Sequence, residues 1–499
     1  MKRIMTILII LGLGFCLSAE IRSLWVLPWN IQSRQAIDQV ISDAVYAHQN
    51  EILLEVRYRA DALYTPNRLN DDFENPEPRS YILSNDDFDP LAYAIEQARA
   101  HQIKVQAWVI VFNATPLDTK LVQNNYIYRN HPEWITYNQR LEKMRTTKQF
   151  GYYIDPGIPE VQDYLLDVFS DIVSGYPLLD GLHLDYVRYP DATWGFHPIS
   201  KRRFDTEGEG LSWNQWRTLQ VTEFVTKCHD RIKSINPQIM LSAAVIADIY
   251  DARINYAQDW YSWLEQGLID RAYPMAYQQK FDTFVNHLTQ MSQQSDPDAI
   301  VVGIRAWDPQ GRSLMNTENH HYCINDVAKR IEAIRELGFA GIALFSYEGL
   351  KPGNALQHLG DISYFEVPEL ACESLLSQAS TDYSTLGQSW PVLQSQTFFR
   401  RSFGVDPQSV DAIFSLDQDL YLINLKIPKE GRWYWELRDA KQRRIYHRYR
   451  YYYKGDNEDY WDGLLENGAR IQSGRYNLFL SSDTASHQVE VYLRELRHN

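Results

Sequence analysis

Short apolar stretches alternate with amphipathic stretches from about residue 21 to residue 346. The apolar stretches have the length and composition of strands, whereas the stretches between them repeat apolar residues every three to four positions, as helices do. Ser33, for example, can cap a helix that carries Ile37 and Ile41 on one face. The pattern predicts eight strands, at Ile21–Leu27, Ile52–Arg57, Lys104–Val111, Asp180–Asp185, Ile239–Val245, Ile269–Pro274, Ile300–Ile304 and Gly341–Phe345.

Eight strand–helix repeats within about 340 residues predict an α/β protein with a (β/α)8 TIM barrel. A doubly wound open sheet is the alternative, but the sequence contains no glycine-rich phosphate loop that would support it. Two long segments, 58–89 and 112–156, interrupt the repeat after the second and third strands. In a barrel, both would rise over the carboxyl ends of the strands.

The pattern changes after residue 365. Residues 366–397 are rich in Ser, Gln and Thr and are predicted to form a linker, whereas residues 398–499 contain only strand patterns and predict a small β-sandwich. We therefore predict a barrel domain at 20–365 and an all-β domain at 398–499. The second domain resembles the immunoglobulin-like domain of flagellar hook-capping proteins, through Trp461, Asp462, Gly463, Asn467, Gly468, Gly474 and Tyr476. This resemblance implies a fold and not an activity.

The N-terminus reads as a secretory signal. Lys2 and Arg3 precede an apolar segment that is too short to span a bilayer, and Ala19 offers a small residue at a cleavage point. The pattern predicts a signal peptide at 1–19 and secretion to the bacterial periplasm or cell surface. An uncleaved anchor, or lipid attachment at Cys16, is the alternative, and it is the one link to a membrane that the sequence indicates.

Composition narrows the choice of partners. The net charge of −15 disfavours nucleic acid as a partner, because nucleic-acid binding requires a basic face. Aromatic residues make up 13% of the chain, which suits both a packed core and the stacking of sugar rings. The 4 cysteines show neither a disulfide framework nor a zinc-binding spacing, and we expect no metal and no cofactor.

The predicted fourth strand, within "LLDGLHLDYVRYPD", carries two polar residues where a buried strand should be apolar. Alternate residues of a barrel strand face the helices and the interior, so Leu182 and Leu184 suit the helix side. His183 and Asp185 then point inward, at the carboxyl end where barrel enzymes hold their catalytic residues. A structural ion pair inside the barrel is the alternative.

Other strand ends bring further candidates to the same rim. Glu55 and Arg57 have inward parity on the second strand, where they either bind substrate or form an internal ion pair. The other candidates are Trp108, Asp248, Tyr277, Trp307, Tyr347 and Glu348 at strand ends, and Trp134 in the "NHPEW" stretch of the second long segment. Together they predict a carboxylate-containing cleft with aromatic walls, which is what glycoside hydrolysis requires.

These positions suggest roles. We predict that Asp185 is a catalytic carboxylate and that its partner is Asp248, Glu348 or Glu55, in that order of preference. His183 is expected to orient Asp185 or to bind the sugar. The residues expected to bind substrate are Glu55, Arg57, Trp108, Trp134, Tyr277, Trp307 and Tyr347.

The motifs "RSLWVLPWN", "VRYRADALY", "HPEW", "DGLHLDYVRYP" and "GIALFSYEGL" occur in this order, and as a set they resemble the glycosyl-hydrolase-like family 10, also called DUF187. The resemblance implies a (β/α)8 barrel, export in bacteria and action on glycans, including cell-wall or envelope strands. Family members typically read D-G-I-H-x-D-D-Y at the fourth strand. Asp180, His183 and Asp185 match this motif, but Tyr186 replaces its second Asp, so the role of that Asp does not transfer.

We therefore expect an exported glycoside hydrolase with a two-carboxylate mechanism. Its expected partner is a polysaccharide or oligosaccharide, with peptidoglycan glycan strands as one candidate. A non-catalytic glycan-binding protein on a hydrolase fold is the alternative, supported by Tyr186. A metal hydrolase that uses His183 and Asp185 is a third, weaker alternative, because a single histidine lies at a strand end.

Overall fold

The computed structural model describes residues 20–69, 73–83, 87–146, 150–278, 280–308, 311–316, 322–364, 411–417, 420–427, 431–452, 455–461, 465, 471–482 and 485–493. The predicted signal peptide and the predicted linker lie outside these residues. The chain divides into two compact units, one built on the N-terminal strands and one on the C-terminal strands.

The first unit is a closed barrel of eight strands in the order β1 to β8, each parallel to its neighbours. The strands are β1 (Ile21–Val26), β2 (Glu51–Arg57), β3 (Lys104–Ile110), β4 (Gly181–Asp185), β5 (Met240–Ile246), β6 (Arg271–Met275), β7 (Val301–Arg305) and β8 (Gly341–Phe345). Each observed strand overlaps the predicted one, and the predicted (β/α)8 fold is confirmed.

Helices follow the strands and surround them. They are α1 (Arg34–Tyr46), α2 (Pro90–Ala100), α3 (Thr119–Val122), α4 (Tyr126–Asn130), α5 (Pro159–Gly175), α6 (Pro198–Glu207), α7 (Trp213–Ile235), α8 (Ile249–Tyr256), α9 (Trp260–Glu265), α10 (Phe281–Gln294), α11 (Ile324–Glu336), α12 (Tyr347–Leu350) and α13 (Ala355–Leu359). Short helical turns are η1 (Pro28–Asn30), η2 (Pro132–Trp134), η3 (Pro297–Ala299), η4 (Pro352–Asn354) and η5 (Gly360–Tyr364). Among the described residues, no helix is long and apolar enough to cross a membrane.

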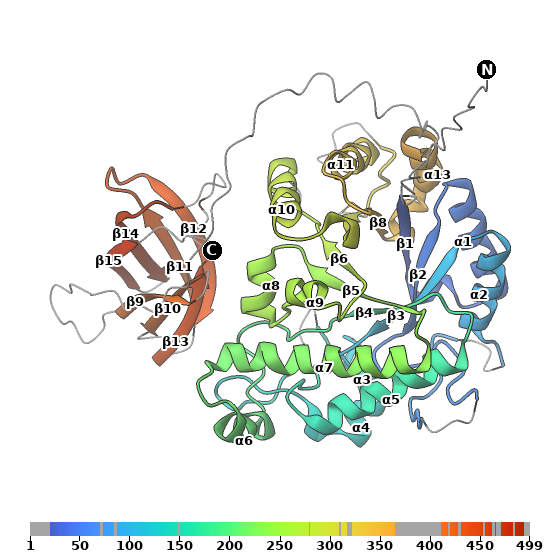
Figure 1. Ribbon diagram of the computed structural model, residues 1–499, viewed down its shortest axis with the longest axis horizontal. Helices are drawn as coiled ribbons and strands as arrows, with labels where there is room; N and C mark the ends of the chain where they lie inside the picture. The colour runs from blue at the N-terminus through green and yellow to red at the C-terminus, as the bar shows by residue number, and fades with distance from the viewer. Residues whose placement is uncertain are drawn as a thin grey trace, which may run out of the picture. The chain divides into compact units, whose positions relative to one another are not determined.

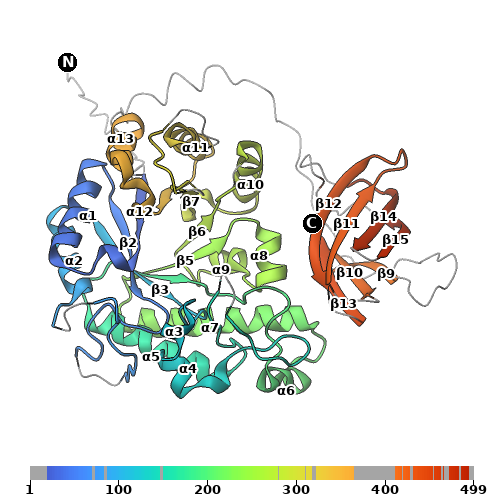
Figure 2. The same ribbon diagram turned by 180° about the vertical axis from the view of Figure 1, so that it is seen from behind.

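The larger helices lie around the outside of the strands, with α1 and α2 beside β2, and α5 and α7 beside one another (Figure 1). The view from behind shows the same ring (Figure 2). The first helix forms as its pattern predicts: the Ser33 side chain accepts a hydrogen bond from the backbone of Ala36, and Ile37, Val40 and Ile41 are buried. Apolar helix faces of this kind cover the outward-facing side chains of the strands.

The two long segments depart from the simple strand–helix repeat. The segment after β2 packs partly against α5, where Asp171 accepts hydrogen bonds from the Asn67 backbone at 2.9 Å and the Asn75 side chain at 2.7 Å. The segment after β3 carries α3, α4 and η2, and both views place α4 beside α5 (Figures 1 and 2). Much of each segment is therefore anchored to the helical layer.

The second unit contains only antiparallel strands among its described residues. They are β9 (Asp411–Asp417), β10 (Leu420–Ile427), β11 (Gly431–Arg438), β12 (Arg444–Tyr452), β13 (Gly455–Trp461), β14 (Gly474–Ser482) and β15 (Ala485–Leu493). One sheet has the order β13-β10-β9 and the other has the order β12-β11-β14-β15. Residues from both sheets, including Ile423, Trp435 and Leu480, share one buried core. The predicted all-β domain is confirmed, and its immunoglobulin-like character stays a prediction.

Candidate active site

Asp185 is the last residue of β4 and lies at the carboxyl end of the barrel, as predicted. Its Oδ2 accepts a hydrogen bond from the Trp108 indole at 3.2 Å, and its Oδ1 accepts one from the backbone N–H of Tyr186 at 2.6 Å. Burial raises the pKa of Asp185, whereas Arg188, these two hydrogen bonds and Arg59 act in the opposite direction. The site therefore holds donors and cations that favour an ionised Asp185.

Glu55 is the second carboxylate at this end of the barrel. It lies on β2 and is only 3% exposed. Burial raises its pKa to about 8, although Arg59 lowers it, and the charge of nearby Asp185 raises it further. No described residue donates a hydrogen bond to the Glu55 carboxyl group. Burial raises the pKa of both carboxyl groups, but only Asp185 receives hydrogen bonds that oppose this effect. The two carboxyl groups therefore lie in different surroundings, as those of an acid and a base, or of an acid and a nucleophile, do.

Two arginines and a tyrosine surround this pair. The guanidinium carbons of Arg59 and Arg188 lie 5.1 Å and 4.9 Å from the centroid of the Tyr186 ring. Tyr186 has a φ of 54°, a left-handed conformation that costs a non-glycine residue about 1 kcal/mol or more and that clusters at functional sites. It stands in the position of the second Asp of the family motif, so at this position an aromatic face replaces a carboxylate.

Several buried polar atoms beside the pair have no hydrogen-bond partner within the described part of the chain. They are the side-chain amide of Asn113, the hydroxyl of Tyr153 and the Nε atoms of Arg59 and Arg188. Such atoms cost free energy unless something pairs with them, and the hydroxyl groups of a sugar could do so. None of these residues was singled out from the sequence. Arg59 and Arg188 do occur in the family motifs "VRYRADALY" and "DGLHLDYVRYP", and that was the available signal.

The two preferred partners of Asp185 make contacts with other residues, Asp248 before α8 and Glu348 within α12. The Asp248 side chain is 40% exposed and lies 4.0 Å from Nε2 of His287. The Glu348 side chain is 49% exposed, at the start of α12, and lies 3.5 Å from Nζ of Lys351. The structure thus brings Glu55, the third choice, near Asp185, whereas the first two choices are partly exposed and lie close to other residues.

Arg57 does not face the site, which corrects its expected role in substrate binding. The register between β2 and β3 shifts between Glu55 and Arg57, so that Arg57 aligns with Val109 and points outward. Its guanidinium pairs with Glu77 at 2.5 Å, and both side chains have 0% exposure. Arg57 therefore forms the internal ion pair that was the alternative prediction, but its partner is Glu77 and not Glu55.

His183 points into the barrel as predicted, but it does not contact Asp185. The Trp25 indole N–H donates to Nε2 of His183 at 3.2 Å, so Nε2 is unprotonated and Nδ1 carries the proton, which faces Ser242 Oγ at 2.8 Å. Ser242 in turn donates to Gln106 at 2.7 Å. Both ring nitrogens of His183 are thus hydrogen-bonded to residues other than Asp185. His183 therefore connects three strands of the barrel and does not orient Asp185, which was its expected role.

Because burial lowers the pKa of His183 to about 3, its neutrality should be visible in the pH dependence of stability. Between about pH 6.5 and pH 3 His183 is protonated in the unfolded chain but neutral in the native state, so lowering the pH through this range removes roughly 5 kcal/mol of stability at this residue. His183→Gln cannot titrate. We expect urea titrations to show a stability gap between wild type and variant that narrows as the pH falls. A gap that is independent of pH would contradict this role.

The predicted aromatic residues divide into two groups. Trp108 contacts Asp185 directly, Tyr277 stacks on Phe345 with ring centroids 5.5 Å apart, and Trp307 is 36% exposed after β7. Asp185 contributes to a raised pKa of Tyr277, after burial, which places that ring near the carboxylate pair. These residues suit a sugar-binding wall.

Two aromatic residues have packing roles instead of the expected substrate contacts. The Trp134 ring stacks on His131 at 3.8 Å and lies 5.2 Å from Tyr164, inside the segment after β3. The Tyr347 hydroxyl donates to Asp43 of α1 at 2.7 Å, and the side chain is 2% exposed. Tyr347 starts α12, and the helix turns its ring toward α1 and away from the barrel mouth.

The described residues contain no group of three or more His, Cys, Asp or Glu side chains that could hold a metal ion. The chemistry assigned below uses only the two carboxylates and the groups around them.

A closed parallel barrel with buried carboxylates at its carboxyl end is the architecture of many glycoside hydrolases. The sequence model of the family described as Glycosyl hydrolase-like 10 matches residues 18–308, and the chain belongs to this family. The resemblance seen in the sequence is thereby confirmed for the barrel.

Two curated relatives carry the name glycosyl hydrolase. Glycosyl hydrolase DigH of Escherichia coli O6:H1 is 27% identical over 223 residues, which cover 39% of this chain and 48% of DigH. Glycosyl hydrolase YngK of Bacillus subtilis is 23% identical over 295 residues, which cover 52% of this chain and 54% of YngK. The chain thus spans about half the length of each relative.

A solved structure shares the fold. The glycoside hydrolase domain of PgaB (BpsB) from Bordetella bronchiseptica superposes with a TM-score of 0.53 and 13% identity, over 70% of this chain and 99% of that domain. At this identity the likeness concerns the fold alone, and it agrees with the barrel described above.

Proposed function

We propose that the protein is an exported glycoside hydrolase that cleaves glycan chains of the cell wall or envelope, with Glu55 as the general acid and Asp185 as the second carboxylate. The observation that carries the proposal is the contrast between these residues. Glu55 is buried, receives no hydrogen bond from the described residues and has a pKa raised to about 8, whereas Asp185 receives two hydrogen bonds and lies near two arginines. Glu55 can protonate the departing oxygen while Asp185 attacks the sugar or activates water.

The surroundings support a sugar as the substrate. Tyr277 and Trp307 offer aromatic faces, and Asn113 and Tyr153 hold polar atoms that lack partners among the described residues. Aromatic faces orient sugar rings, and amide and hydroxyl groups pair with sugar hydroxyls. The proposed location outside the cell rests on the N-terminal pattern of the sequence.

The pH profile should report the proton on Glu55. Turnover is expected to fall as the pH rises through about 8, because Glu55 then loses the proton that the leaving group needs. The remaining activity of Glu55→Gln should not fall as the pH rises through this range, so its pH profile should lack the alkaline limb. Initial rates of both proteins across mildly acid to alkaline pH give the comparison, and an alkaline limb that persists in Glu55→Gln would assign it to another group.

Glycan cleavage itself is tested on isolated material. The protein is incubated with purified peptidoglycan glycan strands, with and without stem peptides, and with uncharged chitin oligosaccharides, and new reducing ends are counted. We expect release from at least one of these glycans and almost none from Asp185→Asn. Binding without release from any of them, over a wide pH range, would sink the hydrolase proposal.

A non-catalytic glycan-binding protein is the second candidate. It is favoured by Tyr186, which replaces a motif carboxylate with an aromatic ring close to Arg59 and Arg188. A ring in that position could support a sugar without reacting with it. The release experiment decides between the two functions.

A further inference from the structure

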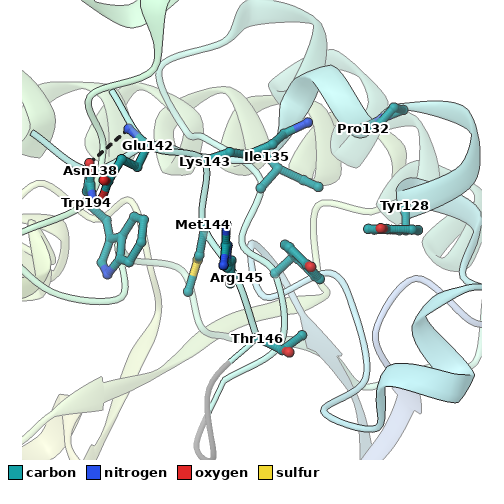
Figure 3. A pocket seen from close by; sticks show the side chains of 11 residues that line it. Tyr128, Pro132, Ile135, Asn138, Glu142, Lys143, Met144, Arg145, Thr146 and Trp194 are labelled. Carbon is teal, nitrogen blue, oxygen red and sulfur yellow. Dashed lines mark hydrogen bonds between the residues drawn. The ribbon is translucent and has the colours of Figure 1, made fainter. Parts of the chain in front are cut away.

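A cavity that neither Glu55 nor Asp185 lines is built mainly from the segment after β3. Its volume is about 890 Å³, which falls within the range of small-ligand sites. Its walls come from α4, from the chain that follows η2, and from Trp194 in the connection between β4 and α6 (Figure 3). Segments distant in the sequence therefore build it together.

Three half-buried aromatic rings line this cavity. Tyr128 and Tyr152 have ring centroids 5.3 Å apart with an interplanar angle of 45°, and in Figure 3 Trp194 and Tyr128 appear on opposite sides of the cavity. Buried Ile135 and Met144 provide an apolar floor. Open aromatic faces above an apolar floor are suited to the flat C–H faces of sugar rings.

The cavity is also basic. Lys143 and Arg145 line it, and no described residue forms a salt bridge with either of them. Partial burial lowers the pKa of Lys143, and the charge of nearby Glu133 acts in the opposite direction. The one acidic residue of the lining, Glu142, already accepts a hydrogen bond from Asn138 at 2.8 Å. An anionic group on a ligand could form charge-assisted hydrogen bonds with both cations.

The cavity and the active site share a wall. Neighbouring residues of extended backbone point to opposite sides, and here Tyr152 lines the cavity while the Tyr153 ring lies 6.1 Å from that of Tyr186. The backbone of Tyr152 accepts a hydrogen bond from Ala114, just after β3, at 2.9 Å. A ligand in the cavity would therefore lie one layer of backbone away from the carboxylate pair.

We propose that this cavity is an accessory binding site for an acidic glycan segment, whose sugar rings stack on Tyr128, Tyr152 and Trp194 and whose carboxylates pair with Lys143 and Arg145. The inference rests on the proposed function, because the occupant is a distal stretch of the polysaccharide that the barrel cleaves. The site would hold a long chain near the barrel without taking part in bond cleavage.

The experiment measures binding and cleavage separately. Peptide-free peptidoglycan glycan strands, which carry carboxylates, are compared with the same strands after conversion of the carboxylates to amides, by affinity electrophoresis at low and high salt. Trp194→Ala should weaken binding of the acidic strands roughly tenfold, the effect of losing one aromatic contact. Lys143→Met should remove much of the preference for acidic over amidated strands and much of the salt dependence.

Matched controls come from exposed residues outside the cavity. Tyr46→Ala removes an aromatic ring that is 57% exposed on α1, and Lys120→Met removes an exposed charge on α3. Both should bind like wild type. Cleavage of substrates too short to span both sites should be unchanged in Trp194→Ala and Lys143→Met.

The outcomes separate the two proposals. Unchanged binding in folded Trp194→Ala and Lys143→Met would overturn the accessory site, whatever the catalytic result. If wild type binds the strands but cleaves none of the glycans tested, the hydrolase proposal is wrong. Weaker binding of the strands by Trp194→Ala would still support the accessory site in that case. Melting curves establish that each variant is folded.

Discussion

Asp185→Asn is expected to lower the rate of glycan cleavage at least about a hundredfold while the protein melts close to wild type. The variant keeps the shape of the side chain and removes its charge. One of the two donors, the Trp108 indole or the Tyr186 backbone N–H, then faces the amide N–H₂ group of Asn in place of an oxygen and loses its hydrogen bond. Loss of a buried charge beside Glu55 offsets this cost, because that charge raises the pKa of Glu55.

Glu55→Gln should lose activity to a similar extent, because Gln cannot donate a proton to the leaving group. Asp248→Asn and Glu348→Gln are the matched controls, since they remove carboxylates that are partly exposed and lie close to other residues. Both controls should keep most of the activity. A folded Asp185→Asn that cleaves glycan at the wild-type rate, or an Asp248→Asn that cleaves none, would contradict the assignment of the carboxylate pair. Rates of reducing-end release and melting curves supply both readouts.

The sequence predicted the barrel and the inward direction of several residues because both depend on local geometry. Alternation along a strand places Glu55, Trp108, His183 and Asp185 inside a barrel whatever its further contacts. The eight strands were found for the same reason, since each is a short apolar run between turn signals. These predictions needed no knowledge of distant contacts.

The choice of partner for Asp185 could not be made in this way. Asp248 and Glu348 lie beyond the last residues of β5 and β8, and the direction of a side chain beyond a strand end depends on contacts with other segments. Glu55 differs from them through burial and through the charge of Asp185, which is 130 positions away in the sequence. Its raised pKa is a property of the folded barrel and has no local signal.

Arg57 shows the same limit within a single strand. Its parity was read as inward, but a shift of register after Glu55 turns it outward to Glu77, a residue of the long segment. Nothing in "EILLEVR" marks this shift, because the partner that stabilises it lies 20 residues later. His183 was likewise placed correctly and interpreted incorrectly, because its partners Trp25 and Ser242 belong to other strands.

The largest effect on stability is expected from Glu77→Gln, at about 3–5 kcal/mol of lost free energy of unfolding. Both side chains of the Arg57–Glu77 pair have 0% exposure, so Gln leaves the Arg57 guanidinium charged and buried without the carboxylate that is hydrogen-bonded to it. Tyr164 also donates to the Glu77 carboxylate, at 2.5 Å, and would lose a charged acceptor. Urea unfolding of the wild type and the variant measures the difference.

Two comparisons make this result specific. Glu207→Gln breaks the exposed ion pair with Arg203 on α6 and should cost at most about 0.5 kcal/mol, because water screens such pairs. The double variant Arg57→Met with Glu77→Met removes both buried charges and should recover much of the loss, since no charge is then left unpaired. If Glu77→Gln were no more costly than Glu207→Gln, the buried pair would not hold the strand end. Because Arg57 follows Glu55 by two residues, a displaced Arg57 should also disturb the general acid, and Glu77→Gln should lose turnover even under conditions where it stays folded.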